Sequence, residues 1–305
     1  MTGHDHAHHH GTAGARHRGR LAWVLGLTLV VMAVEVVGGL LSGSFALVAD
    51  AGHMLTDAAG LAVALGATVL AGLPPTARRT FGWQRAEVLA ALVNGLVVGV
   101  VGVLVLVEGI RRVVHPGDVE PRLMLGVALL GLAANAVGLV LLHRGRRESL
   151  NVRGAYLEVL GDALGSVAVV AAALVVLATG FVRADGIASV VIALLVLPRA
   201  AVLLRDVAVV LLEATPAGVD LDTVREHMTR VPGVVGVHDL HAWTITSGVP
   251  VLSAHVVVAD EELDRAGTGR VLDALRTCLA GHFDVDHCTF QLEPASHGGE
   301  RGLHP

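Results

Sequence analysis

Residues 21–41 read LAWVLGLTLVVMAVEVVGGLL, a run of 21 residues in which Glu35 is the one ionisable side chain. A helix of about 20 apolar residues is long enough to cross the ~30 Å hydrocarbon core of a bilayer. Because hydrocarbon offers the backbone no hydrogen-bond partner, such a run is expected to be helical. Five further runs follow, at roughly 45–72, 86–110, 123–142, 154–180 and 184–204. The sequence therefore predicts an α-helical membrane protein with six transmembrane helices.

The composition supports a membrane protein. Hydrophobic residues make up 53 % of the 305 residues and charged residues 16 %, whereas soluble domains carry charged residues at roughly 25 %. These values exclude a disordered chain and argue against a purely soluble enzyme. The net charge of −5 argues against a nucleic-acid partner. The two cysteines, Cys278 and Cys288, indicate no disulfide framework.

The positions of the arginines predict the orientation of the chain. All 22 basic residues are arginine, and twelve of them lie before the first run, in the second and fourth connections, or at the end of the sixth run. The remaining connections hold four. Because positive charge gathers on the cytoplasmic side, both termini are expected in the cytoplasm, with the chain in the plasma membrane. No cleavable signal peptide is expected, because the first apolar run is long enough to span.

The N-terminal tail, residues 1–20, holds six histidines between His4 and His17. It is too polar to fold alone. A flexible group of imidazoles can collect divalent metal ions, although a remnant of an expression tag or a neutral low-complexity segment would have a similar composition.

After Pro216 the pattern becomes that of a soluble domain. It predicts helices at 219–231 and 261–280, the second ended by Gly281, and strands at 234–245, 249–258 and 285–292. The order αββαβ favours a small sheet backed by helices. The expected domains are the tail 1–20, a membrane domain 21–205, a cytoplasmic domain 206–294 and a flexible end 295–305.

Two pairs of ionisable residues lie inside the predicted spans. His53 and Asp57 are four residues apart in the second span, and Glu158 and Asp162 are four apart in the fifth. Residues at this spacing share a helix face, and a rise of ~1.5 Å per residue brings both pairs near the middle of the bilayer. One imidazole and three carboxylates suit tetrahedral Zn²⁺ and are acceptable to Co²⁺, Cd²⁺ or Mn²⁺. The alternative is a set of interhelical polar contacts or of side chains that reach back to water.

The other polar groups in the spans are weaker candidates. Most lie near span ends or alone, or are expected to form hydrogen bonds between helices. Asp50 lies one turn before His53 and could pass protons, but a packing role is favoured. The remaining members of this set are Glu35, Glu87, Glu108, Asn94 and Asn135.

The soluble domain carries candidate metal ligands on its predicted strands. His238 and His241 lie beside the first strand, His255 on the second, and His287 and Glu293 on the last. Imidazoles and a carboxylate on neighbouring strands could form a second metal site, although exposed histidines are common on soluble sheets.

Several motifs resemble those of one family. They are HMLTD at 53–57, FGWQRAE at 81–87, GAYLEVLGDALGS at 154–166, HDLHAW at 238–243 and SAH at 253–255. These stretches are similar to signatures of the cation diffusion facilitator family, in its zinc-exporting branch. The resemblance covers nearly the whole chain from Leu21 to Glu293.

The resemblance implies a homodimeric metal/proton antiporter. It implies a transport site formed by His53, Asp57, Glu158 and Asp162, and a cytoplasmic domain with a ferredoxin-like, metallochaperone-like fold that binds metal and dimerises. The ligands implied there are His238, His255 and Glu293, with His287 as a further candidate. Two positions depart from the zinc-type pattern, since Glu158 stands where a second histidine is usual and Gln84 where many members have histidine.

The predicted function is the proton-coupled export of divalent cations, foremost Zn²⁺, from the cytoplasm. Alternatives are an exporter of Co²⁺, Cd²⁺ or Mn²⁺, and a membrane metal sensor that does not transport. A membrane metalloenzyme is disfavoured, because the chain has no HExxH helix and the midplane ligands leave no spare general base. The protein is therefore not expected to be an enzyme, and no prosthetic group is expected beside the metal ion.

Overall fold

The computed structural model describes residues 13–143, 150–216, 218–246, 248–282 and 287–296. The chain forms two compact units. The first unit comprises residues 1–62 and 93–202, which contain most of the long apolar helices. The second comprises residues 63–92 and 203–305, which contain the small sheet.

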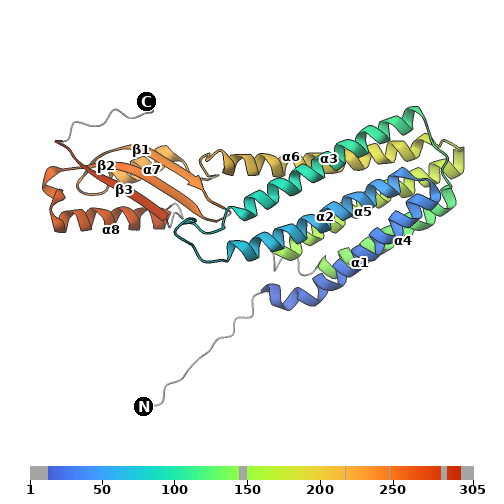
Figure 1. The fold of residues 1–305 in the computed structure, drawn as a ribbon, viewed down its shortest axis with the longest axis horizontal. Coiled ribbons are helices and arrows are strands. Elements are labelled where there is room, and N and C mark those ends of the chain that lie inside the picture. The colour runs from blue at the N-terminus through green and yellow to red at the C-terminus, as the bar shows by residue number, and fades with distance from the viewer. Residues whose placement is uncertain (1–12, 144–149, 217, 247, 283–286, 297–305) are drawn as a thin grey trace, which may run out of the picture. The chain divides into compact units, whose positions relative to one another are not determined.

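Six long helices confirm the predicted spans (Figure 1). Each is long and apolar enough to cross a membrane, so the chain is a multi-pass membrane protein. Their bounds are α1 Ala13–Ser42, α2 Phe45–Ala71, α3 Ala86–Val114, α4 Pro121–His143, α5 Leu150–Thr179 and α6 Arg183–Leu211.

Two of these helices, α1 and α6, extend well beyond the apolar runs predicted. Helix α1 begins at Ala13, inside the segment expected to be a flexible tail, because alanine and arginine are good helix formers and no proline precedes Leu21. Helix α6 contains Pro198 and nevertheless continues to Leu211, past the expected end at 204. Only the residues that lie in hydrocarbon have to be apolar. A helix can therefore continue beyond its apolar run into water.

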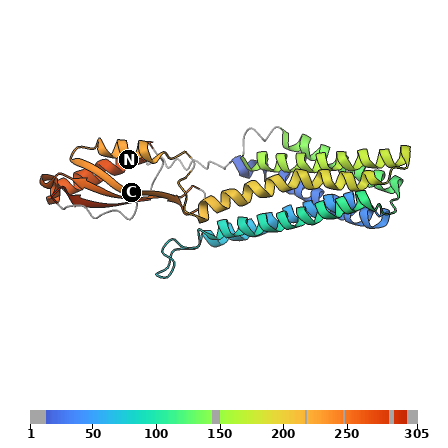
Figure 2. The ribbon, with the colours of Figure 1, turned by 90° about the horizontal axis from the view of Figure 1, so that it is seen from above.

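Small residues set the packing of the membrane helices. In the main apolar core, α4 contributes Val127 and Ala128 and α5 contributes Val169 and Ala173. Helices α3 and α6 lie side by side in both views (Figures 1 and 2). They touch where a Cβ on Gly186 would be 2.9 Å from the carbonyl oxygen of Gly109. The glycines therefore let the two backbones meet directly.

The start of α2 is fixed by a carboxylate from α6. Asp185 is 2 % exposed, and its Oδ1 accepts a hydrogen bond of 2.6 Å from the Ser44 hydroxyl. The backbone N–H groups of Phe45 and Ala46 donate to the same carboxylate at 3.0 and 3.2 Å. Asp185 thus satisfies two of the free donors at the α2 N-terminus, and the negative charge suits that end of a helix.

The second unit contains the predicted αββαβ domain. Its elements are α7 Leu221–Thr229, β1 Val234–Thr244, β2 Pro250–Val258, the 3₁₀ helix η2 Asp260–Leu263, α8 Arg265–His282 and β3 His287–Pro294. The sheet order is β1-β2-β3, with β1 antiparallel and β3 parallel to the central β2. Helix α8 continues through Gly281, which was expected to end it, so a single glycine near a helix end does not stop it.

The core of this small domain joins the sheet to both helices. Met228 of α7, Leu252 of β2, and Leu275 and Leu279 of α8 are fully buried together. Because these side chains occupy one face of the sheet, the other face can present polar groups.

Candidate metal centres

Helices α2 and α5 bring three of the four predicted intramembrane ligands together. His53 and Asp57 of α2 and Asp162 of α5 each offer a ligand atom, and these atoms all lie within 4.8 Å of one another. His53 Nε2 is 3.4 Å from Asp57 Oδ2. His53 and Asp162 are buried and Asp57 is partly buried. The three groups therefore form a candidate metal site that is largely shielded from water.

The fourth predicted ligand, Glu158, lies outside this group. It is one turn before Asp162 on α5 and partly buried, and its carboxylate interacts electrostatically with Asp57 and Arg199. Glu158 therefore faces the site at longer range, and its role as a ligand stays a prediction.

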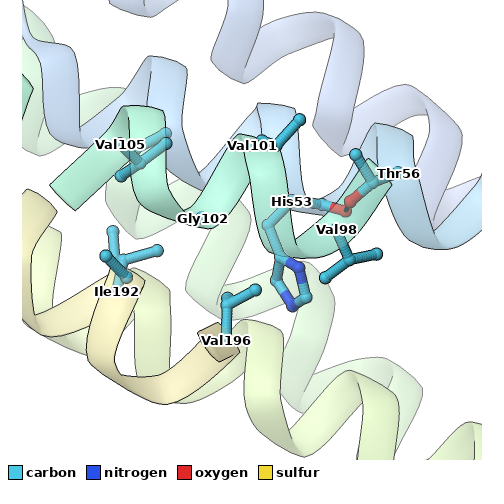
Figure 3. A pocket seen from close by; sticks show the side chains of 10 residues that line it. His53, Thr56, Val98, Val101, Gly102, Val105, Ile192 and Val196 are labelled. Atoms are coloured by element: carbon cyan, nitrogen blue, oxygen red, sulfur yellow. Dashed lines mark hydrogen bonds between the residues drawn. The ribbon is translucent and has the colours of Figure 1, made fainter. Parts of the chain in front are cut away.

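The imidazole of His53 also borders a small pocket between α2, α3 and α6 (Figure 3). Its wall includes Val98 of α3 and Val196 of α6, with space for about one water molecule. The hydroxyl of Thr56 donates to the backbone carbonyl of His53 at 2.7 Å, so it does not compete for the imidazole. The apolar wall limits the access of water to the site from this side.

Arg199 of α6 was expected at the membrane surface, but its side chain reaches the site. Its Nη1 lies 3.4 Å from His53 Nε2, and its charge acts on Asp57 and Asp162. A guanidinium can only donate, so Nε2 accepts and the proton of a neutral His53 is on Nδ1. Arg199 therefore holds the lone pair that would otherwise bind a metal. Its position inside the α6 helix, before Leu211, was the available signal.

A second cluster lies on the sheet of the small domain. His238 Nε2 is 3.0 Å from Glu293 Oε2, and His255 Nδ1 is 2.8 Å from Glu293 Oε1. The ligand atoms of the three residues lie within 4.8 Å of one another, so three predicted cytoplasmic ligands converge. Gln291 donates to Glu293 Oε1 at 2.9 Å and helps to orient the carboxylate.

A bulge in β1 gives His238 its direction. His238 pairs with His255 across the sheet, and the register then shifts before His241. Between them Asp239 has a φ of 44°, in the left-handed region, which aspartate tolerates better than most residues. Such a bulge turns a side chain away from its regular alternation, and here it brings His238 beside Glu293.

Hydrogen bonds shift the protonation of this cluster. Burial disfavours a charged imidazole, but the bonds to Glu293 and Asp239 outweigh it and raise the pKa of His238. Burial also disfavours a charged carboxylate, yet the bonds from His238 and His255 hold the pKa of Glu293 below its ordinary value. Without metal, the cluster therefore favours a carboxylate beside a protonated imidazole, and a metal ion has to displace that proton.

The other predicted histidines lie elsewhere. His287 is exposed at the start of β3, and its ring meets Phe81 edge-on with 5.4 Å between centroids. It does not belong to the cluster of three, so its role as a ligand stays a prediction. Of the N-terminal histidines, His4 to His10 lie outside the described residues.

Comparison with known proteins identifies the family. The family model described as the cation efflux transmembrane domain matches residues 21–212, and that of the cation efflux protein cytoplasmic domain matches residues 216–295. The zinc transporter ZitB of Escherichia coli is 44 % identical over 90 % of this chain and 87 % of its own length. The metal cation efflux system protein CzcD of Cupriavidus metallidurans is 42 % identical over 96 % and 90 %.

Two further matches are a transporter and a solved domain. The cadmium, cobalt and zinc/H(+)-K(+) antiporter of Bacillus velezensis is 37 % identical over 97 % of this chain and 95 % of its own. The metal-bound C-terminal domain of the CzcD transporter is 42 % identical, with 25 % of this chain and 99 % of that domain covered and a TM-score of 0.22. From the family models and the relatives, the chain is a member of the cation diffusion facilitator family, in the branch of the zinc exporters, and is a cation efflux transporter and not an enzyme.

Proposed function

We propose that the protein exports divalent metal ions, foremost Zn²⁺, from the cytoplasm in exchange for protons. The observation that carries this is the gathering of His53, Asp57 and Asp162 within 4.8 Å between two membrane-spanning helices. The names of two relatives, the zinc transporter ZitB and the cadmium, cobalt and zinc/H(+)-K(+) antiporter, support both parts of the proposal.

The set of ligands supports Zn²⁺ as the transported ion, with Mn²⁺, Co²⁺ or Cd²⁺ as the alternatives. One imidazole and two carboxylates, with Glu158 as the fourth ligand, suit a tetrahedral ion with nitrogen and oxygen ligands. A carboxylate where zinc-type members usually have histidine makes the set harder, which favours Mn²⁺ more than a set with two histidines would. Co²⁺ and Cd²⁺ are also compatible with these ligands.

Metal and protons compete for the same atoms. A carboxylate or imidazole has to be free of its proton to coordinate a metal ion, so metal binding at the site releases protons. Protons that arrive from outside then displace the ion, and cytoplasmic metal displaces the protons. Movement of the helices around a fixed midplane site would alternate its access, as in other secondary transporters.

The guanidinium of Arg199 supplies positive charge at the membrane site when no metal ion is bound. A metal ion and a guanidinium within hydrogen-bond reach of the same imidazole repel each other. Arg199 therefore withdraws from His53 when the metal binds, and it returns to screen the carboxylates after the metal leaves.

The small domain adds regulation and assembly. Both termini lie in the cytoplasm of a plasma-membrane protein, the domain pairs two copies of the chain, and the cluster of His238, His255 and Glu293 binds cytoplasmic metal. His287 and the N-terminal histidines deliver metal to it or bind it transiently.

The test is Zn²⁺ uptake by proteoliposomes with an imposed pH gradient. The wild-type protein transports and Asp162→Ala does not, because the site loses a ligand. Glu108→Gln, on an α3 carboxylate that pairs with Arg111, is the matched control and transports normally. Full uptake by Asp162→Ala would refute the proposed site. Metal binding by a wild-type protein that never transports would favour the sensor.

A further inference from the structure

A further polar cluster lies in the membrane unit, about one helical turn from the three converging ligands. Its acidic members are Glu35 of α1 and Asp50 of α2, each 1 % exposed. Buried Ser166 of α5 and Asn135 of α4 complete it. We call Glu35 and Asp50 the outer acid pair. Four helices thus supply one polar group each to a single buried place.

Contacts within the cluster form a chain that ends on a carboxylate. Asn135 Nδ2 donates to Ser166 Oγ at 3.3 Å, and the Ser166 hydroxyl donates to Asp50 Oδ2 at 3.5 Å. Glu35 Oε1 lies where a side chain on Gly131 would stand, and Ser166 Oγ is 3.5 Å from that same point. The Ser166 hydroxyl therefore stands between the two acids.

Each acid keeps an oxygen without a hydrogen-bond partner. Glu35 Oε2 and Asp50 Oδ1 are fully buried and unbonded, and within the described part of the chain no ion pair links either acid to a basic side chain. Two neighbouring buried carboxylates without a cation would be very unfavourable. A bound proton or metal ion at the outer acid pair would remove this cost.

The space at the pair favours the smallest cation. Glu35 packs against Gly131 and Asp50 against Gly165 so closely that a methyl group at either glycine would collide with the carboxylate. The atoms at the pair that could coordinate a metal ion are all oxygens, since the remaining polar atom is the amide nitrogen of Asn135. This set of ligand atoms lacks the imidazole that zinc sites commonly use. A proton needs no additional room, and it converts an unbonded carboxylate oxygen into a donor.

The outer acid pair is continuous with the metal site. Asp50 is one turn before His53 on α2, and Ser166 is one turn after Asp162 on α5. The charges of Asp50 and Asp57 act on Asp162, and the charges of Asp50 and Asp162 act on Glu35. From the α1–α2 connection, Glu35 and Asp50 lie about 8–11 Å along their helices and His53 about 12 Å. In the proposed orientation that connection faces outside.

From this arrangement we infer that Glu35 and Asp50 form a proton-binding site, distinct from the metal site, through which external protons reach the transport ligands. This rests on the proposed proton-coupled export. A proton from external water adds to a carboxylate oxygen of the pair. Its transfer to Asp162 restores the pair and breaks a metal–carboxylate bond, and the next metal ion releases it to the cytoplasm. Among the described residues, Asp162 of α5 is a titratable group whose charge acts on Glu35, and α4 presents Asn135 through Ser166.

Neutral isosteres of the two acids test the inference. Full-length Glu35→Gln, Asp50→Asn and the double variant would be reconstituted beside the wild type and the control Glu108→Gln. Zn²⁺ binding would be measured by calorimetry, and Zn²⁺ and proton fluxes would be measured in the same vesicles. We expect the outer variants to keep Zn²⁺ binding, to move fewer protons per Zn²⁺, and to lose the dependence of transport on external pH.

The outcomes separate the two proposals. Unchanged proton-to-zinc ratios and pH profiles in both single variants and the double variant would overturn the inference while leaving proton-coupled export intact. A wild-type protein that transports Zn²⁺ without proton movement would instead refute the proposed coupling. If a variant fails to insert into the membrane, infrared difference spectra of the wild-type protein test whether a buried carboxylic acid takes up external protons. A buried carboxylic C=O band that responds to external pH supports the pair, and its absence refutes it.

Discussion

The two clusters use the same kinds of ligand in different surroundings. In the membrane unit, His53 and Asp162 are buried among apolar helices, and Arg199 supplies the positive charge. In the small domain, His238 and His255 are half-buried on a sheet, and the hydrogen bonds to Glu293 and Asp239 raise the pKa of His238 and so favour a proton there. The proposed transport requires the membrane site to keep out water and to exchange one cation for another. The cytoplasmic site equilibrates with solvent, which suits a sensor of metal concentration.

We expect the largest effect from a substitution that removes a ligand either from the membrane site or from the cluster of the small domain. Asp57→Asn should reduce Zn²⁺ transport by more than about 100-fold, since even the loss of groups that only orient metal ligands costs ~10–100-fold. Zn²⁺ binding at the cytoplasmic cluster should be unchanged. His255→Ala gives the reverse pattern, with cytoplasmic binding lost and the transport site occupied. Loss of both functions in either variant would show that the clusters do not act separately.

Replacing Arg199 tests whether its guanidinium competes with the metal ion at the membrane site. Arg199→Gln should bind Zn²⁺ at that site about tenfold more tightly, or ~1.4 kcal/mol, because a competing charge within 4 Å is gone. Release should slow, so turnover falls while affinity rises. Arg199→Lys keeps the charge and is the control. Equal Zn²⁺ affinity in wild type and Arg199→Gln by calorimetry would contradict the competition.

The pH dependence of cytoplasmic binding tests the proton on His238. Its pKa is raised above 6.5, so Zn²⁺ binding should weaken as pH falls through that raised value, by at most about tenfold per unit for one displaced proton. Asp239→Asn removes one cause of the shift without removing a ligand. It should therefore move the midpoint of a pH titration downward. A midpoint that stays in place would contradict the assignment.

The smallest effect concerns metal preference at the membrane site. Glu158→His should shift transport toward Zn²⁺ over Mn²⁺ by severalfold, because imidazole is a softer ligand than carboxylate. Competition between the two ions in proteoliposomes measures this ratio, and Glu158→Gln controls for loss of the charge. An unchanged ratio would place Glu158 outside the coordination sphere.

The elements were largely predictable because their signals are local. Apolar length identified six helices, and alternation with turn residues identified the αββαβ order. The i,i+4 pairs also predicted which residues of α2 share a face. The ends of α1 and α6 were misplaced, because apolarity does not report where a helix stops in water.

Contacts between helices could not be predicted from spacing alone. Arg199 was assigned to the membrane surface and Glu35 was considered isolated, yet both face polar groups on other helices. Their partners depend on how each helix is rotated, which one sequence does not specify. The direction of His238 likewise depends on a bulge at Asp239 that alternation does not reveal.

The attachment of α2 to Asp185 of α6 restricts how these two helices can separate. With these ends joined, a tilt of α2 pivots about that point. His53 lies about 12 Å from the pivot, so a tilt of ~10° displaces it by about 2 Å and the far end of the helix by several times more. Arg199 and His53 then part by a small swing, while the ends of the helices far from Asp185 move apart most.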